Sequence, residues 1–142
     1  MWGKSVGQKL IVVADDDPAC RGLMAEILTD AGYACVEAEC GRSALALIDL
    51  RPDLLLTDLF MPDLDGIEII LKAKQTWPGV RIAAISGGIG AFDPMVLLRM
   101  AAILGADVAL PKPFSVDQLL TCVAQALAAE RPSADPGAQD VR

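Results

Sequence analysis

The chain has 142 residues, of which 54% are hydrophobic but only 4% aromatic, and its 12 basic and 19 acidic side chains leave a formal net charge of −7. This length is typical of one domain with a core of its own, and an aliphatic core is typical of a sheet covered on both faces. Because a surplus of negative charge repels nucleic acids and anionic lipids, we expect no direct contact with nucleic acid or with a membrane.

The N-terminus and the cysteines indicate the cellular location of the protein. Residues 1–8 lack the apolar run of a secretion signal, and no apolar stretch reaches the length of about eighteen residues that spans a membrane. The chain has no histidine, so a structural zinc site would need all four cysteines, and no two of them form a C-x-x-C pair. We therefore expect buried free thiols and a cytoplasmic location. The cysteines are Cys20, Cys35, Cys40 and Cys122.

The first strand and helix are indicated by an apolar run and a helix start. Residues 10–14 form the run, and Asp17 followed by Pro18 is typical of an N-cap and a first helical position. Apolar residues at spacings of three and four then continue to Gly32, where the helix should end. The residues expected to face the core are Cys20, Leu23, Met24, Ile27, Leu28 and Ala31.

The same alternation of strand and helix continues along the chain. Asp93 and Pro94 repeat the helix start, and Ser115 is placed to cap the last helix. Five such units imply an α/β fold in which helices cover both faces of a parallel sheet. We assign residues 9–129 to this domain, 1–8 to an extension and 130–142 to a disordered tail. The further strands are expected at residues 33–38, 53–57, 80–85 and 107–110, and the further helices at residues 42–50, 66–76, 94–104 and 116–127.

Four of the predicted strands end in residues that suit phosphate chemistry. Residues 15–17 are all aspartate and follow the first strand, Asp58 follows the third, Ser86 the fourth and Lys112 the last. Since open parallel sheets bind ligands outside the carboxyl ends of their strands, these side chains should share one edge. Carboxylates about 4 Å apart repel each other by roughly 4 kcal/mol at an effective dielectric constant near 20. A divalent cation such as Mg²⁺, which prefers oxygen ligands, would offset that repulsion.

The order and spacing of these segments resemble the receiver domain of two-component response regulators. The resemblance covers about residues 9–128 and implies the flavodoxin-like fold, a doubly wound parallel sheet of five strands in the order 2-1-3-4-5 with five helices. The segments that carry it are residues 12–18, 52–58, 61–62, 65–66, 85–87 and 110–114.

The resemblance implies a role for each acid of the edge. Asp58 would be the phosphoacceptor, whose carboxylate attacks phosphorus and forms a mixed anhydride. Asp16 and Asp58 would ligate Mg²⁺ directly, and Asp15 would do so mostly through water. The backbone carbonyl of Phe60 would complete the protein's share of the ligands. Asp17 needs no such role, because a helix cap explains it.

The resemblance also implies roles for Lys112 and Ser86. The ammonium of Lys112 would neutralise charge on the phosphoryl group, and the Lys112-Pro113 bond would be cis. Ser86 would donate its hydroxyl to a phosphoryl oxygen and move inward once Asp58 is modified. Without the resemblance, a serine before two glycines is more often a plain turn residue.

The sequence departs from the usual pattern of the family in the region that would transmit the signal. Ala109 stands three residues before Lys112, where receivers commonly carry the aromatic residue that rotates on activation. The segment from Ser86 to Gly105 is a few residues longer than usual and contains three glycines between residues 87 and 90. We expect this region, with the helix at residues 94–104 that it contains, to form a partner-specific surface, which could equally serve a homodimer. Apolar side chains of such a helix are more often part of the core than of an interface. Its apolar residues are Met95, Leu97, Leu98 and Met100.

The sequence therefore predicts a stand-alone receiver that is phosphorylated on Asp58 by a histidine kinase or a histidine phosphotransfer protein. With no further domain predicted, its output would pass through contact with a downstream protein. Its chemistry would be limited to its own phosphorylation and dephosphorylation, so we do not expect an enzyme.

Three other classes of protein compete with this interpretation. An aspartyl-nucleophile phosphatase would carry a second acid two residues after Asp58, where this chain has Phe60. A nucleotide-binding fold would place a glycine-rich turn after the first strand, where residues 15–18 are acidic and end in proline, and residues 86–90 are too short and wrongly placed. A pseudo-receiver would keep the fold and bind partners without phosphorylation.

Overall fold

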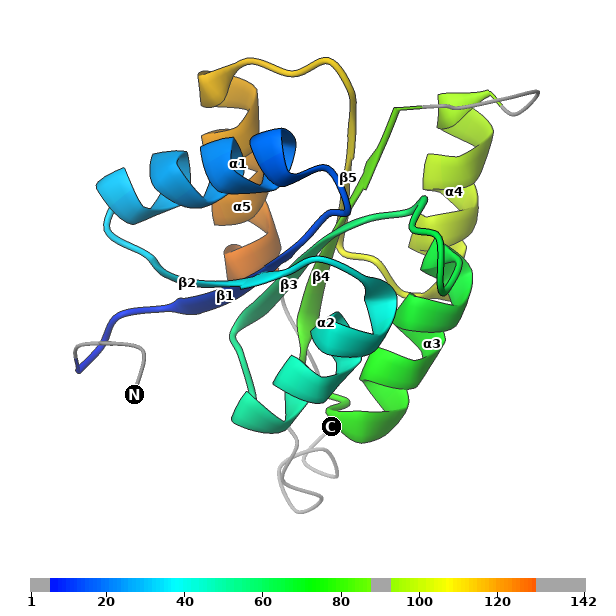
Figure 1. Ribbon diagram of the computed structural model, residues 1–142, viewed down its shortest axis with the longest axis horizontal. Helices are drawn as coiled ribbons and strands as arrows, with labels where there is room; N and C mark the ends of the chain where they lie inside the picture. Colours follow the sequence, from blue (N-terminus) through cyan, green and yellow to red (C-terminus); the bar gives the residue numbers. More distant parts are fainter. Residues whose placement is uncertain (1–5, 88–92, 130–142) are drawn as a thin grey trace, which may run out of the picture.

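Five parallel strands form the centre of the computed structural model, which describes residues 6–87 and 93–129 (Figure 1). Their order in the sheet is β2-β1-β3-β4-β5, so β2 and β5 are the edge strands. The predicted fold class and strand order are thereby confirmed. The strands are β1 (Leu10–Ala14), β2 (Ala34–Ala38), β3 (Leu54–Asp58), β4 (Arg81–Ser86) and β5 (Val108–Pro111).

Helices cover both faces of this sheet. In Figure 1, α1 and α5 lie against one face, and α2, α3 and α4 lie against the other. A doubly wound arrangement of this kind buries the strands from both sides, which explains why their sequences are continuous apolar runs. The helices are α1 (Pro18–Asp30), α2 (Gly41–Leu47), α3 (Gly66–Thr76), α4 (Pro94–Leu104) and α5 (Val116–Ala128), and a short 3-10 turn, η1 (Ile48–Leu50), follows α2.

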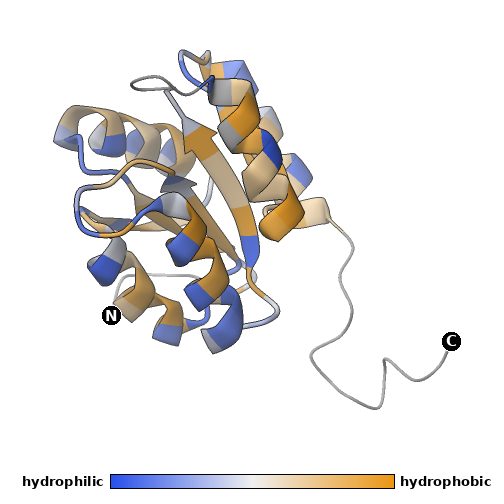
Figure 2. Cartoon of the chain, turned by 90° about the vertical axis from the view of Figure 1, so that its right-hand side faces the viewer, coloured by the Kyte–Doolittle hydropathy of each residue, from blue (hydrophilic) through white to orange (hydrophobic). Residues whose placement is uncertain are grey.

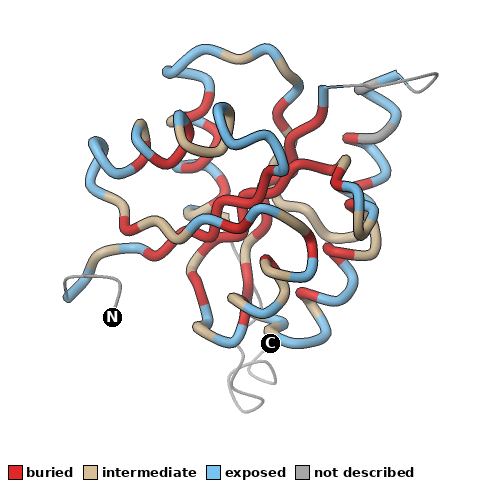
Figure 3. The backbone as a smooth tube through the Cα atoms, viewed as in Figure 1, coloured by how far each residue is buried: buried red, intermediate tan, exposed pale blue. Residues whose placement is uncertain are grey.

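The sheet separates two apolar cores. On one face, residues such as Val12 and Leu55 pack against α2, α3 and α4, while on the other Val13 and Leu56 pack against α1 and α5. All residues of β1 and β3 are buried, and the centre of the tube in Figure 3 is accordingly red. Figure 2 shows the matching hydropathy: the helices carry both hydrophobic and hydrophilic residues, as elements with one buried face must.

The predicted helix starts are confirmed by their hydrogen bonds. Asp17 and Asp93 each accept the N–H of the residue two positions later, at 3.0 and 2.9 Å. Ser115 accepts the N–H of Gln118 at 3.1 Å, and the Gln118 side chain accepts the N–H of Ser115 in return. These caps fix where α1, α4 and α5 leave the edge of the sheet that carries the polar residues.

Some local predictions are wrong. The helix expected at residues 42–50 is shorter, because the chain turns into η1 and ends at Arg51 in the left-handed region with φ 52°. Leu23, expected in the core, has 59% of its surface exposed, and Ala31 is also exposed. All four cysteines are free as expected, but only Cys122 is buried and the other three are half-buried.

Part of the predicted organisation cannot be compared with the structure. The tail at residues 130–142 lies outside the described residues, as do residues 1–5 of the extension and residues 88–92 of the glycine-containing segment. Within the described ranges, no helix combines the length and the apolar character that crossing a membrane requires.

Candidate functional site

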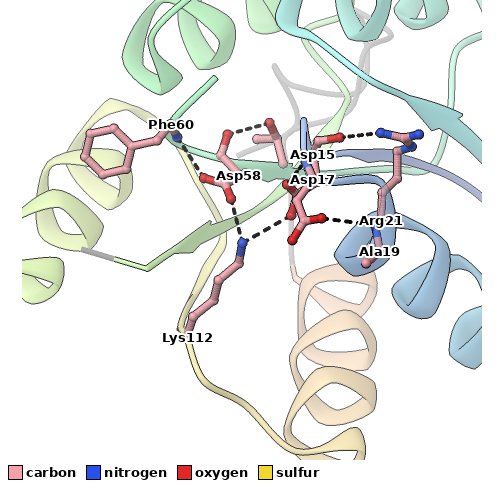
Figure 4. Close-up of polar contacts among 8 residues, drawn as sticks. Asp15, Asp17, Ala19, Arg21, Asp58, Phe60 and Lys112 are labelled. Atoms are coloured by element: carbon pink, nitrogen blue, oxygen red, sulfur yellow. Dashed lines mark hydrogen bonds and ion pairs between the residues drawn. The ribbon is translucent and has the colours of Figure 1, made fainter. Parts of the chain in front are cut away.

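The carboxyl ends of three strands meet in one polar cluster (Figure 4). Asp15 directly follows β1, Asp58 closes β3 and Lys112 directly follows β5. Lys112 Nζ lies 2.7 Å from Asp58 Oδ2 and 3.2 Å from Asp15 Oδ2. Both carboxylates are buried, with exposed fractions of 1% for Asp15 and 6% for Asp58. The parallel sheet therefore places these three side chains together although 97 residues separate the outer two.

Burial and the shared ammonium together set the ionisation of the cluster. Burial raises the pKa of Asp58, and its hydrogen bonds with Lys112 and the Phe60 N–H offset only part of that effect. Burial alone would lower the pKa of Lys112, but its hydrogen bond and charge interaction with Asp58, together with the charge of Asp15, raise it. The lysine therefore stays protonated. The cluster holds two carboxyl groups and one ammonium, so its acidic groups outnumber its basic ones.

The loop after Asp58 folds back toward it. Asp58 Oδ1 accepts the N–H of Phe60 at 2.8 Å, and the carbonyl of Leu59 accepts the N–H of Gly66 at 2.9 Å. Gly66 is required here, because a Cβ atom at that position would lie 2.6 Å from the Cα of Leu59. Phe60 also forms an isolated bridge with Asp65, which caps α3. Phe60 is thus held beside Asp58, in the part of the chain where the resemblance predicts a carbonyl ligand.

The loop after β1 is held by a residue that we did not single out from the sequence. Arg21 donates from Nη1 to the backbone carbonyl of Asp15 at 2.8 Å (Figure 4). It also donates from Nε to Glu37 at 3.1 Å. Asp15 Oδ1 in turn accepts the N–H of Asp17 at 2.9 Å. A basic residue one helical turn after an acidic loop is the signal that could have indicated this contact.

The other predicted site residues are placed less centrally. Ser86 is fully buried at the end of β4, and its carbonyl accepts the N–H of Lys112 at 2.8 Å. The Lys112-Pro113 bond is cis, as predicted. Asp16 is exposed. Within residues 6–87 and 93–129, no group of three or more Asp, Glu, Cys or His side chains stands close enough together to hold a metal ion.

The chemistry of the donors nevertheless fits a hard cation. Mg²⁺ is usually held by one or two protein carboxylates and keeps several waters, so three converging acids are not required. A carboxylate has about four lone-pair sites, and each oxygen of Asp58 has one protein hydrogen bond among the contacts described above. Asp16 presents a further carboxylate to solvent on the same loop as Asp15. The magnesium ligands stay a prediction.

A second residue outside the predicted set, Asp63, connects the loop between β3 and α3 to helix α2. Asp63 Oδ1 accepts the N–H of Gly41 and Oδ2 accepts the N–H of Arg42, both at 2.9 Å. These two backbone hydrogen bonds, that of Arg42 first, lower the pKa of Asp63 to about 2. The signal in the sequence is weak: Asp65 already caps α3, so the cap of this helix does not explain Asp63.

The surface expected on α4 is present in part. Met95 and Met100 are exposed, as are Val96 and Ile103, but Leu98 has only 4% of its surface exposed and belongs to the core. For Leu98 the alternative of a core position therefore holds, and the side chain of Leu97 lies outside the described part. Ala109 is half-buried and packs against the core beneath α4.

Comparison with known proteins assigns the family. The family model for the response regulator receiver domain matches residues 11–124, most of the chain. The chain belongs to this family, whose members act in two-component signalling. It is 38% identical over 112 residues to the response regulator MprA of Mycolicibacterium vanbaalenii, a match that covers 78% of this chain and 46% of MprA. The chain thus spans about half the length of that relative.

Solved structures agree in fold. A CheY-like receiver domain protein from Methanospirillum hungatei superposes with a TM-score of 0.77 at 28% identity, covering 85% of this chain and 94% of that one. A response regulator protein from Burkholderia pseudomallei gives a TM-score of 0.71 at 27% identity, covering 81% of this chain and 66% of that one. The Burkholderia structure contains a phosphorylated aspartic acid, a calcium ion and citrate.

The contact of Lys112 with two buried acids predicts the effect of removing the lysine. Lys112→Met should lower the free energy of unfolding at neutral pH by about 1–3 kcal/mol, because two buried carboxylates lose their shared counter-charge. Urea denaturation without divalent cations measures this loss. Adding Asp58→Asn to Lys112→Met should recover part of it, since one of the two charges is then gone. A Lys112→Met variant as stable as the wild type would contradict the prediction.

The contact of Asp63 with α2 predicts a pH dependence of stability. Because folding lowers the pKa of Asp63 from 3.8 to about 2, unfolding takes up a proton within that range. The stabilisation is complete above the unfolded-state pKa and is lost as the pH falls through the folded-state value. Urea denaturation between about pH 4 and pH 2 should show the wild type losing more free energy of unfolding than Asp63→Asn. Identical pH profiles of the two proteins would show that the contact does not form.

Proposed function

We propose that this chain is a phosphoacceptor receiver in which Asp58 takes a phosphoryl group from a histidine kinase or a histidine phosphotransfer protein. The observation that carries the proposal is the position of Lys112 Nζ, within hydrogen-bond distance of Asp58 and Asp15 at the carboxyl edge of the sheet. A carboxylate beside a fixed ammonium suits transfer of a highly charged group. The phosphorylated aspartic acid of the Burkholderia relative supports the same chemistry for this fold.

The proposed transfer is a displacement at phosphorus. One carboxylate oxygen of Asp58 forms a bond to phosphorus while the bond from phosphorus to the donor's imidazole nitrogen breaks. The imidazole leaves with the electron pair of that bond and, with a proton on its other nitrogen, departs neutral. The product on Asp58 is an acyl phosphate. No oxidant, reductant or second substrate is needed.

Each residue of the cluster has a part in this step. Lys112 carries a positive charge, because its contacts with Asp58 and Asp15 raise its pKa against the lowering effect of burial. Its ammonium has three N–H donors that can turn toward phosphoryl oxygens. Asp15 helps to hold that ammonium in place. Ser86 would donate its hydroxyl to a phosphoryl oxygen, and its carbonyl is already bonded to the N–H of Lys112. Because the Asp58 carboxylate is buried, few waters compete with the donor.

Mg²⁺ is the cofactor that the donor set suits best. Asp16, Asp58 and the backbone carbonyl of Phe60 would hold it directly, and Asp15 mostly through water. When bound, the ion would neutralise charge on the phosphoryl oxygens. The calcium ion in the Burkholderia relative is likewise a hard cation that prefers oxygen ligands.

The output would pass through protein contacts. Phosphorylation adds roughly one negative charge at Asp58. It shifts the protein from one conformation to another only as far as the phosphoryl group interacts more favourably with the second conformation. The exposed apolar residues of α4 offer a surface for a downstream protein or for a homodimer. We propose no direct nucleic-acid or membrane contact and no turnover of an external substrate. The cytoplasmic location stays a prediction. The exposed residues are Met95, Val96, Met100 and Ile103.

Labelling with acetyl phosphate tests this function. With Mg²⁺ present, the wild type should gain the mass of one phosphoryl group, and it should gain none when the cation is removed by a chelator. Asp58→Asn should not be labelled. Asp53→Asn, which changes an acid at the opposite end of β3, should be labelled like the wild type.

The alternatives give different results in the same assay. A wild type that stays unlabelled with Mg²⁺ would indicate a pseudo-receiver. Steady release of phosphate from a generic phosphomonoester would indicate a phosphatase. Labelling that survives Asp58→Asn would contradict the assignment of the phosphoacceptor.

A further inference from the structure

The loop between β3 and α3 carries Phe60, and its middle part is docked on α2. Near its ends the loop is fixed to its own neighbours, through the Phe60 N–H to Asp58 and the Gly66 N–H to Leu59. Asp63 differs, because its carboxylate reaches a separate element, the start of α2, 22 residues earlier in the chain. The position of the loop relative to the sheet therefore depends on α2 as well as on β3 and α3.

The start of α2 is built to receive this carboxylate. Its N-cap residue, Cys40, forms a capping box with Ser43, the third residue of the helix, which leaves the amides of the first two residues in need of another partner. Asp63 supplies one oxygen to each of the first two, the N–H groups of Gly41 and Arg42. The negative charge also interacts favourably with the positive end of the helix dipole. The contact is reciprocal: it caps α2, and it holds the loop.

A close backbone approach at the same place supports the docking independently. Gly41 is buried, and a Cβ atom there would lie 2.8 Å from the Cβ of Leu64 and 3.1 Å from Ile69 Cδ1. Only glycine leaves room for the loop to lie this close to α2. The next residue of the loop after Asp63 thus packs against the same turn that Asp63 binds through its carboxylate.

We propose that Asp63 is a positioning residue for the phosphorylation site, which acts by clamping the β3–α3 loop to α2 and so fixes the backbone of Phe60 beside Asp58. This inference rests on the proposed function, in which the Phe60 carbonyl is a ligand of Mg²⁺. Asp63 would touch neither the metal nor the phosphoryl group, because its carboxylate is bound to the amides of Gly41 and Arg42. Its effect is on the preorganisation of the loop, as for residues that orient metal ligands from outside the coordination shell.

The clamp predicts weaker cation binding when it is released. Asp63→Ala removes both hydrogen bonds, and the Mg²⁺ dissociation constant of the unphosphorylated full chain should rise about tenfold in isothermal titration calorimetry. Asp63→Asn keeps one acceptor oxygen and should show a smaller rise. Asp107→Ala is the matched control: this carboxylate accepts the N–H of Ile82 at 2.8 Å, but it precedes β5 and so lies at the opposite edge. It should lose stability and keep the wild-type affinity.

Amide hydrogen exchange, measured without any cation, tests whether Asp63 holds the loop on α2. The amides of Phe60, Gly41 and Arg42 should exchange faster in Asp63→Ala than in the wild type and in Asp107→Ala. This readout separates the clamp from a general loss of stability, because both variants lose a carboxylate that accepts a backbone N–H.

The Mg²⁺ titration and the hydrogen exchange together distinguish a failure of this inference from a failure of the proposed function. Wild-type labelling and Mg²⁺ binding, combined with unchanged affinity and unchanged exchange of the Phe60 amide in Asp63→Ala, would overturn the clamp alone. A wild type that neither binds Mg²⁺ nor accepts a phosphoryl group would overturn the proposed function, and the role of Asp63 in phosphorylation with it.

Discussion

The ammonium of Lys112, shared by two buried carboxylates, is the interaction on which the site depends. Neither Asp15 nor Asp58 would be stable as a buried anion without a counter-charge, and one lysine serves both. The contact joins the ends of β1, β3 and β5 across the carboxyl edge of the sheet. Since the two acids outnumber the ammonium, the same contact leaves the site with a preference for a cation.

The fold explains why these groups can meet. Helices on both faces bury the apolar strands, so polar side chains are excluded from the middle of the sheet and gather where the strands end. Two further contacts then hold the loops that follow β1 and β3. Arg21 binds the backbone of Asp15, and Asp63 binds the start of α2. The cluster is thus surrounded by contacts that fix backbone as well as side chains.

The elements and the central cluster could be predicted from the sequence because their signals are local. Apolar runs mark the strands, and cap residues such as Asp17 and Ser115 mark helix starts, so most boundaries agree within one or two residues. The meeting of Asp58 with Lys112 follows from parallel topology alone. The contact of Asp63 with Gly41 could not be predicted in this way, because the two residues lie 22 positions apart and meet only through packing. The same holds for Arg21 and Glu37, which lie 16 positions apart.

Packing also explains the errors. Leu23 has the helical spacing of a core residue, but its side chain is exposed. The buried face of α1 is narrower than the apolar face that the spacing predicts, since its buried residues are Met24, Ala25 and Leu28. Cys20 and Cys35 are half-buried because α1 and the edge strand β2 are covered on fewer sides than the central strands.

An NMR titration of Lys112 tests the shared ammonium most directly. The carbon next to the amine is followed with rising pH, in the metal-free wild type and in Asp58→Asn. The lysine should lose its proton at a higher pH in the wild type than in the variant, because its hydrogen bond and charge interaction with Asp58 raise its pKa. Equal midpoints in the two proteins would contradict the account, since the ammonium would then be held by something other than Asp58.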